Sequence, residues 1–355
     1  MGYVGPGVVD QLRKAYPDAT LIGYDMGYFA SCLTNAAVLP ESKLDMQLFG
    51  DVRTIDAEIL TGVDAVVHLA AISNDPMGTR FEDITLDVNY KTSIAIAKLA
   101  KEAGVKNFVF ASSCSMYGAA SEKAKTEDAE LNPLTAYARS KVFTEKELEP
   151  LAGDGFTVTC LRFATACGMS DRLRLDLVLN DFVAGAVTTG KINILSDGTP
   201  WRPLIHVKDM ARAIEWAVTR EASNGGEFLA VNTGSNEWNY QVTDLAEAVA
   251  DVIPGTVVSI NRNAAPDKRS YRVNFDLFKK LAPNHQPVYT LNEAIQGLRD
   301  GLLEMDFKDG DFRNSLLMRL KVLTSLQESN KINEQLQWAH QTAKNKIKQN
   351  ELQTA

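Results

Sequence analysis

Short apolar runs separated by amphipathic segments form the pattern of the first half of the chain. The apolar runs that predict strands are residues 20–25 (TLIGYD), 64–71 (DAVVHLAA), 105–113 (VKNFVFASS) and 156–163 (FTVTCLRF). Residues 88–104 and 136–153 lie between these runs and have the apolar spacing that is typical of helices. Apolar runs without polar alternation favour strands that are buried on both faces of a parallel sheet. The pattern therefore predicts an α/β fold with a Rossmann-like, doubly wound parallel sheet.

The pattern changes after about residue 164. Residues 172–191 predict a helix, residues 191–218 a strand, a turn-rich loop, a strand and a helix, and residues 226–252 a strand, a loop and a helix. We expect residues 1–163 to form a first domain to which residues 204–233 return. Residues 164–310 are expected to form most of a smaller C-terminal lobe.

The C-terminal segment, residues 311–355, is polar and rich in Gln, Asn and Lys. Its apolar positions are Leu316, Leu320, Leu323, Ile332, Leu336, Ala339 and Ala343. This spacing predicts surface helices that pack on the body of the protein or on a partner.

A glycine cluster opens the chain. Gly2, Gly5 and Gly7 precede an amphipathic segment, as in turns whose backbone N–H groups bind a phosphate at the start of a helix. No apolar run precedes the cluster, although a strand is expected there in a sheet of this kind. We therefore expect a gap in the middle of the sheet, beside the strand that ends at Asp25. A start codon assigned too late or a truncated copy would each explain this gap.

Composition and charge exclude several classes of function. The net charge of −8 and the lack of a basic face argue against nucleic-acid binding. The four cysteines, at positions 32, 114, 160 and 167, have no CxxC spacing and predict no metal site. No signal peptide or membrane-length apolar run is present, so we expect a cytoplasmic protein with reduced thiols and no membrane contact.

The candidate chemistry lies around the motif YARSK. Tyr137 and Lys141 are four residues apart and share one face of the predicted helix. A nearby lysine charge favours the phenolate and brings the tyrosine closer to the working range of a general base. Ser112, Ser113 and Ser115 follow a predicted strand at the edge where such sheets place their ligands. Together these residues suggest a Ser-Tyr-Lys catalytic set.

These motifs resemble the extended short-chain dehydrogenase/reductase family, in particular its NAD-dependent nucleotide-sugar epimerases and dehydratases of the UDP-galactose 4-epimerase kind. The matching segments, in order, are GYVG, DAVVHLAA, FASSCSMYG, YARSK, LRFATACG and RPLIHVKDMARA. The resemblance implies bound NAD, a nucleoside-diphosphate sugar as substrate and a 4-keto intermediate. It implies that Tyr137 takes the proton of a sugar hydroxyl, that Ser113 hydrogen-bonds the same oxygen and that Lys141 holds the nicotinamide ribose.

The cofactor residues follow from the same segments. Gly2 and Gly5 are expected to let the backbone approach the pyrophosphate. Asp25 ends a strand at the place where a carboxylate accepts hydrogen bonds from the adenosine ribose, which favours NAD over NADP. By resemblance, Asp51 is the adenine contact, and Ala70 in DAVVHLAA contacts the cofactor; a simple turn aspartate is the alternative for Asp51.

The substrate residues are chosen as donors to a diphosphate. Arginine suits phosphate oxygens, and the resemblance places Arg202, Arg269 and Asn180 at diphosphate or nucleotide contacts. Asp267 is expected to reach the nucleotide ribose, and Thr165 stands where many relatives carry a diphosphate-binding asparagine. Arg172 and Arg174 are nearby, and the sequence leaves open whether they bind substrate or are surface charges. His206 is interpreted as structural.

The residues after Ser113 discriminate between reactions. Sugar-nucleotide 4,6-dehydratases place an acid-base Asp-Glu pair there, whereas this chain has Cys114 and Ser115. This favours an epimerase, with Cys114 interpreted as a small buried hydrophobe. A dehydratase or reductase of the same family and a truncated, non-catalytic NAD-binding relative remain alternatives. The resemblance further implies a homodimer through residues 88–104 and 136–153, and the sugar, the nucleotide and the inverted carbon stay open.

Overall fold

The main sheet is formed by four parallel strands. The computed structural model describes residues 1–73, 75–118, 123–264 and 270–339. The strands of this sheet, in spatial order, are β3 (Ala65–His68), β4 (Asn107–Ser113), β5 (Thr157–Phe163) and β9 (Phe228–Thr233). All three neighbouring pairs are parallel, and Phe110 of β4 pairs with His68 on one side and with Cys160 on the other. The predicted Rossmann-like α/β sheet is confirmed.

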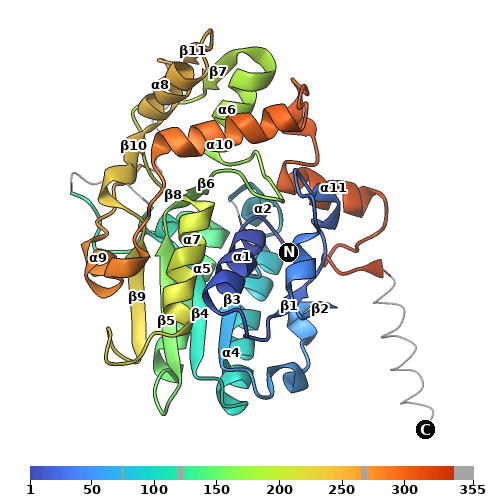
Figure 1. Ribbon diagram of the computed structural model, residues 1–355, viewed down its shortest axis with the longest axis vertical. Coiled ribbons are helices and arrows are strands. Elements are labelled where there is room, and N and C mark those ends of the chain that lie inside the picture. Colours follow the sequence, from blue (N-terminus) through green and yellow to red (C-terminus); the bar gives the residue numbers. More distant parts are fainter. Residues whose placement is uncertain (74, 119–122, 265–269, 340–355) are drawn as a thin grey trace.

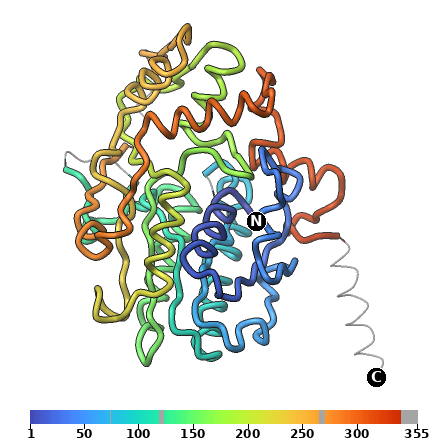
Figure 2. The backbone as a smooth tube through the Cα atoms, viewed as in Figure 1, coloured from blue at the N-terminus to red at the C-terminus, as the bar shows by residue number. Residues whose placement is uncertain are grey.

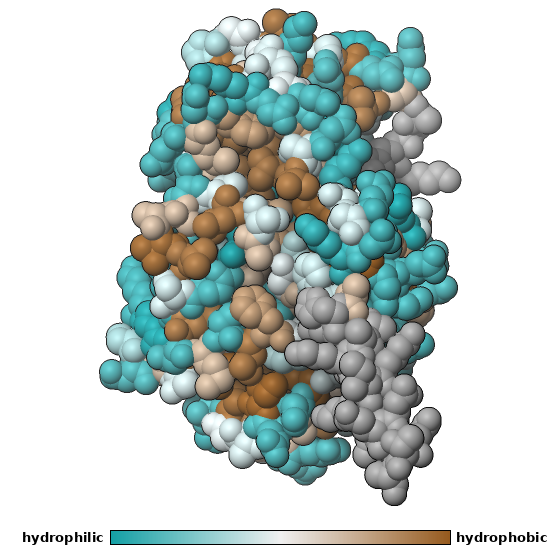
Figure 3. Space-filling model, turned by 90° about the vertical axis from the view of Figure 1, so that its right-hand side faces the viewer, coloured by the Kyte–Doolittle hydropathy of each residue, from teal (hydrophilic) through white to brown (hydrophobic). Residues whose placement is uncertain are grey.

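The sheet is interrupted at the place where the sequence predicts a gap. Strands β1 (Ile22–Asp25) and β2 (Met46–Phe49) form a separate parallel pair, and among the described residues no strand bonds β1 to β3. This pair is poorly covered, since Phe49 is 63% exposed and Met46 51%. Figure 3 shows the side of the molecule that carries the pair, where hydrophobic residues gather in the lower half.

Helices cover both faces of the main sheet, and alternating strand residues decide which helix they meet. On one face, α1 (Gly5–Ala15) and α7 (Val207–Val218) pack on a cluster that includes Val109. On the other face, α4 (Thr92–Glu102) packs on a cluster that includes Phe108. Adjacent strand residues point to opposite faces, so these two apolar neighbours reach different helices. This explains why the strands read as continuous apolar runs.

Three further helices lie along the edge formed by the carboxyl ends of β3 and β4. They are α2 (Asp75–Arg80), α3 (Glu82–Leu86) and α5 (Ala136–Leu148), and a π-helical turn (Asp87–Lys91) leads from α3 into α4. Helix α5 contacts α2, α3 and α4, and it carries the tyrosine and lysine of the YARSK motif. The YARSK helix therefore starts beside the strand ends that the sequence assigned to ligand binding.

The smaller lobe lies above the main sheet in Figure 1. Its helices are α6 (Val178–Thr189), α8 (Val242–Val252) and α10 (Leu291–Glu304), whereas α9 (Asp276–Leu281) lies beside β9 and packs into the core of the main sheet. Its strands form two small sheets, β10 (Asn239–Gln241) with β8 (Trp201–His206) and β6 (Thr165–Cys167), and β11 (Val257–Ile260) with β7 (Lys191–Ile194). The helix predicted over 172–191 is shorter, because residues 172–177 form a loop. No helix within the described ranges has the length and apolar character needed to cross a bilayer.

The described part of the C-terminal segment, residues 311–339, is only partly helical. It contains a short 3-10 helix (Phe312–Asn314) and α11 (Arg319–Glu328), and the chain then turns at Asn330, whose φ of 55° is left-handed and ends a helix. Ile332 and Trp338 form an antiparallel bridge around the turn. In Figure 2 this red segment lies beside the blue loop that follows β1. Ala343 lies outside the described residues.

Candidate functional site

Two caps place the serine and tyrosine of the candidate site. Strand β4 ends at Ser113, whose Oγ accepts a hydrogen bond from the Ser115 N–H (3.2 Å) and donates one to the Ser115 hydroxyl (2.9 Å). Helix α5 begins after Thr135, whose Oγ1 accepts from the Ala138 N–H at 3.1 Å. The cap fixes Tyr137 in the first turn of the helix, facing the end of β4.

The pKa of Tyr137 depends on burial and on its neighbours, among them Ser113, Asp75 and Arg174. Burial raises the pKa of Tyr137 above its usual value, while the Ser113 hydrogen bond and the positive charge of Arg174 act in the opposite direction. The structure therefore adds Arg174 to the groups that favour the phenolate. The sequence assigned this effect to Lys141 alone.

Lys141 lies one turn further along α5 and is only 3% exposed. Its Nζ donates to the backbone carbonyl of Ala111 at 2.6 Å and lies 4.5 Å from the centre of the Phe110 ring. The distance from Nζ to the centre of the Tyr137 ring is 5.5 Å. Burial lowers the pKa of Lys141 to about 8. Ser113, Tyr137 and Lys141 are thus brought together as the sequence predicts.

A cavity of about 130 Å³ opens beside this set. Thr165 and Arg202, two of the predicted substrate residues, line it together with Ser115. Asp75 and Tyr271 line it as well, and sequence reasoning missed both. Asp75 accepts a hydrogen bond from the Thr135 hydroxyl at 2.7 Å, so its carboxylate lies at the start of the tyrosine helix. Its only signal in the sequence is its position shortly after the strand that ends at His68.

Asn180, a predicted substrate residue, does not line this cavity. It is fully buried in α6, and its Oδ1 accepts from the Gly168 N–H at 3.0 Å. Its Nδ2 donates to the Arg174 carbonyl (2.9 Å) and to the Tyr3 hydroxyl (3.2 Å). Asn180 therefore holds three segments of backbone and side chain together. Asp267 and Arg269 lie outside the described residues.

Arg172 and Arg174 are not surface charges. They are 2% and 6% exposed, and each is paired with a carboxylate: Arg172 with Glu41 at 2.9 Å and Arg174 with Asp176 at 2.6 Å. Local sequence gave no sign of this burial, because Glu41 lies far away along the chain. His206 is structural as interpreted, since its Nδ1 accepts from the Lys208 N–H at 3.2 Å and caps α7.

The start of α1 fits a diphosphate. Gly5 is the first residue of the helix, which has no side-chain cap and no acidic residue in its first turn, so its positive end is not neutralised. A Cβ on Gly5 would lie 2.9 Å from the Met1 Cβ, so the close approach requires glycine. Gly2 lies in the preceding turn, where a Cβ would meet no other atom. Glycine is therefore required at position 5 by the packing of Met1, and Gly2 has no such constraint.

The loop after β3 also lies at this edge. It contains Ala70 and is held by Asn89, whose Oδ1 accepts from the Ile72 N–H (2.8 Å) and whose Nδ2 donates to the Ile72 carbonyl (2.9 Å). Asn89 is 1% exposed, so this clamp is part of the core. It fixes the backbone of the loop over the carboxyl end of the sheet, where ligands of such sheets bind.

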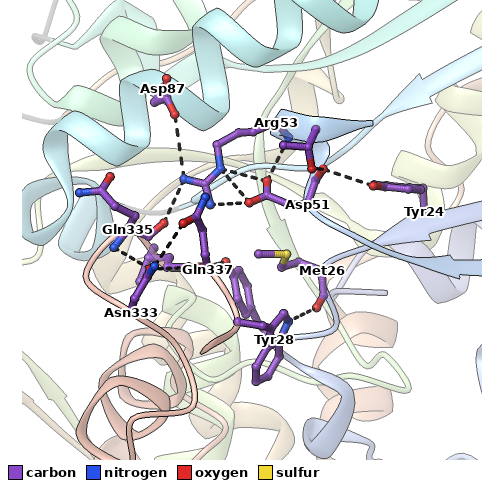
Figure 4. A network of polar contacts seen from close by, with 12 residues as sticks. Tyr24, Met26, Tyr28, Asp51, Arg53, Asp87, Asn333, Gln335 and Gln337 are labelled. Atoms are coloured by element: carbon purple, nitrogen blue, oxygen red, sulfur yellow. Dashed lines mark hydrogen bonds and ion pairs between the residues drawn. The ribbon is translucent and has the colours of Figure 1, made fainter. Parts of the chain in front are cut away.

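The two candidate adenosine contacts are engaged by the protein itself. Asp25 Oδ1 accepts from the Gly27 N–H at 2.6 Å. Asp51 is 8% exposed; it caps a short turn and receives the Arg53 guanidinium, with Nη2 to Oδ2 at 2.6 Å. Figure 4 shows that Arg53 extends from Asp51 to the backbone carbonyl of Gln335, at 2.9 Å. Asp51 therefore caps a turn in this structure.

The donor set as a whole fits a dinucleotide. An uncapped helix N-terminus suits the diphosphate, and the Asp25 carboxylate, at the end of β1, suits a ribose. Among the described residues no three His, Cys, Asp or Glu side chains gather as a metal site requires.

Comparisons with known proteins agree with this geometry. The chain is 26% identical over 286 residues to a UDP-glucose 4-epimerase of Lactobacillus helveticus, covering 75% of this chain and 84% of that protein. It is also 26% identical over 214 residues to a dTDP-glucose 4,6-dehydratase of Streptomyces griseus, covering 59% and 63% respectively.

Solved structures show the same fold. A UDP-glucose 4-epimerase from Stenotrophomonas maltophila with bound NAD superposes with a TM-score of 0.72 at 20% identity, covering 86% of this chain and 96% of that one. An NAD-dependent NDP-hexosamine 5,6-dehydratase of tunicamycin biosynthesis gives 0.73 at 21% identity, covering 87% and 97%. The model of the NAD dependent epimerase/dehydratase family matches residues 1–234. This chain therefore belongs to the NAD dependent epimerase/dehydratase family.

Proposed function

We propose that the protein is an NAD-dependent epimerase that acts on a nucleoside-diphosphate sugar through a 4-keto intermediate. The observation that carries this proposal is the gathering of Ser113, Tyr137 and Lys141 beside a cavity lined by Thr165 and Arg202. A hydroxyl donor, a phenol and a cation at one point suit proton removal from an alcohol. The Arg202 guanidinium, which lines this cavity, suits a phosphate oxygen.

In this proposal the side chains of the protein transfer the proton, and the cofactor supplies the hydride chemistry. Tyr137, as phenolate, takes the proton of the sugar 4-hydroxyl, and Ser113 donates a hydrogen bond to the same oxygen. NAD held by the N-terminus of α1 and the Ala70 loop would supply a reversible hydride acceptor for C4. Lys141 holds positive charge near the phenol and reaches the nicotinamide ribose. Tyr137 then returns the proton to the new hydroxyl, so that no net oxidation occurs.

Cofactor binding is assigned to four elements of the structure. The N-terminus of α1 at Gly2 and Gly5 holds the diphosphate, Asp25 the adenosine ribose, and the loop with Ala70 the face of the cofactor. Asp51 serves the adenosine end through the turn that it caps. Asp267 and Arg269 remain assigned to the nucleotide of the substrate.

Epimerisation is favoured over dehydration by the residues after Ser113. Removal of water from the sugar needs an acid and a base close to C5 and C6. Cys114 is 1% exposed, its Sγ donates to the Arg162 carbonyl at 3.0 Å, and burial raises its pKa. Ser115 has only a hydroxyl to offer. Neither residue supplies the carboxyl pair of a dehydratase, whereas epimerisation at C4 needs none.

The test uses purified full-length protein and two measurements. NAD is released by denaturation and quantified, and nucleoside-diphosphate sugars with different bases and sugars are then incubated with the native protein. We expect near-stoichiometric NAD and conversion of one sugar nucleotide to its 4-epimer without added cofactor. A stable 4-keto product that has lost water would instead identify a dehydratase. Folded protein with no NAD and no affinity for added NAD would contradict the proposal.

A further inference from the structure

Three buried arginines meet where the C-terminal segment joins the body of the protein. Arg172 and Arg174 come from the loop between β6 and α6, and Arg319 is the first residue of α11. Their exposed fractions are 2%, 6% and 2%. The segments are linked by backbone, since the Leu175 N–H donates to the Leu317 carbonyl at 2.9 Å.

Among the described residues, ion pairs join two of the three guanidiniums of the cluster to carboxylates. Glu41 pairs with Arg172, and Asp176 pairs with Arg174. Arg319 donates from Nη2 to the Arg172 backbone carbonyl at 2.7 Å, and its guanidinium lies 4.5 Å from the centre of the Phe29 ring. Within the described part of the chain, its Nη1 is buried and makes no hydrogen bond.

Such an arrangement is costly without an anion. A buried cation with an unused donor loses its hydration, and the Asp176 carboxylate, which attracts Arg319, is already paired with Arg174. Burial and the neighbouring charge of Arg174 lower the pKa of Arg319 to about 10, so the guanidinium is still charged at neutral pH. Helix α11 adds to the excess of positive charge, because its first turn has neither a side-chain cap nor an acidic residue.

The cluster adjoins the segments that the proposed function assigns to ligands. Arg174 Nη1 donates to Ser73 Oγ at 3.1 Å, in the loop that follows β3 and contains Ala70. Its backbone carbonyl is joined through Asn180 to the hydroxyl of Tyr3, just before α1. Arg174 therefore links the arginine cluster to the Ala70 loop and, through Asn180, to the segment that precedes α1.

We propose that Arg319 is a diphosphate-binding residue, which the C-terminal segment contributes to the ligand site together with Arg174. The inference rests on the proposed function for the identity of its ligand. Arginine presents paired donors that match phosphate oxygens, and a diphosphate can accept from two guanidiniums at once. The diphosphate belongs either to the dinucleotide or to the sugar nucleotide. Arg319 lies outside residues 1–234, so the family match does not include it.

The test compares Arg319→Gln, Arg319→Lys and wild type in the full-length protein. Affinities for NAD and for UDP are measured by calorimetry, and inorganic pyrophosphate is used as a third probe through its effect on the melting temperature. Arg313→Gln is the matched control, since Arg313 is on the same segment but exposed and paired with Asp181. Loss of a charged hydrogen bond predicts roughly 10- to 100-fold weaker binding for Arg319→Gln, with the lysine variant between it and wild type.

The outcomes separate the two sources of diphosphate. Weaker NAD binding with unchanged UDP binding assigns Arg319 to the cofactor, and the reverse assigns it to the substrate. Wild-type affinities for both ligands in a folded Arg319→Gln variant would overturn the inference. If Arg319→Gln does not fold, a lysine variant that binds all three probes like wild type would do the same. If wild type binds neither nucleotide, the proposed function fails, while protection by pyrophosphate that is lost in the variants still supports this residue.

Discussion

At the scale of single residues, the proposed chemistry depends on two buried ionisable side chains, Tyr137 and Lys141. Burial raises the pKa of Tyr137 and lowers that of Lys141 to about 8, so it disfavours the charged form of each. The phenol must nevertheless become an anion for catalysis. Arg174 and the Ser113 hydrogen bond are the groups that assist it in this structure.

The pH dependence of stability tests the burial of Lys141. Because its pKa falls from 10.5 to about 8 on folding, the charged form destabilises the native state by about 3 kcal/mol. This penalty is full below pH 8 and disappears as the pH rises from 8 to 10.5. Lys141→Met should therefore be more stable than wild type at pH 7, by an amount that shrinks toward pH 10.5. Urea unfolding across this range gives the difference.

The control for this experiment is Lys146→Met, which removes an exposed lysine from the same helix. Its unfolding free energy should stay close to that of wild type at every pH. A Lys141→Met difference that is constant from pH 7 to 10.5 would show that the lysine is not desolvated as described.

At the scale of elements, the local pattern of apolar residues predicted the strands of the main sheet. The runs at 105–113 and 156–163 became β4 and β5 because each is buried on both faces, which leaves an unbroken apolar run. The tail was predicted less well. Ile332 and Leu336 have helical spacing, yet Leu336 has a left-handed φ of 56° and both side chains enter a core cluster from a turn. Periodicity alone does not distinguish these cases.

The C-terminal turn is expected to stabilise the loop that follows Asp25. Trp338 Nε1 donates to the Met26 carbonyl at 2.7 Å, its ring lies 5.8 Å from that of Tyr28, and Tyr28 donates to the Leu336 carbonyl. Trp338→Ala should lower the free energy of unfolding by about 2 kcal/mol and weaken NAD binding. Chemical denaturation and calorimetry measure the two effects.

Glu334→Ala is the matched control, because Glu334 is exposed in the same turn. It should leave both quantities unchanged. Wild-type stability and NAD affinity in Trp338→Ala would show that the turn is not coupled to the β1 loop.

At the scale of the whole molecule, contacts between distant segments decide the burial and the partners of side chains that local sequence does not predict. The sequence did not decide whether Arg172 is a surface charge or a substrate residue. It is buried against Glu41, which lies 131 residues away along the chain. Asn180 looked like a ligand donor but is used to join the smaller lobe to Tyr3. The interruption between β1 and β3 was predictable, because it follows from the order of apolar runs alone.

The predicted homodimer makes a specific claim about α4 and α5. Phe143 of α5 is 38% exposed and lies 5.6 Å, ring to ring, from Tyr90 just before α4. If this apolar pair is an interface, Phe143→Glu should convert the dimer to a monomer of 38.9 kDa by light scattering. Leu195→Glu, at a residue 84% exposed in the smaller lobe, should leave the mass of wild type unchanged. A monomeric wild type would exclude the dimer.

Proton NMR of sugar-nucleotide conversion by wild type and Tyr137→Phe tests the proposed epimerisation and the role of Tyr137 together. The account predicts that wild type equilibrates one nucleoside-diphosphate sugar with its 4-epimer. Tyr137→Phe should keep its NAD and its fold but act about 10²- to 10⁴-fold more slowly, since it lacks the proton-transfer group. Equal rates for the two proteins, or conversion by neither of them when both hold NAD, would contradict the account.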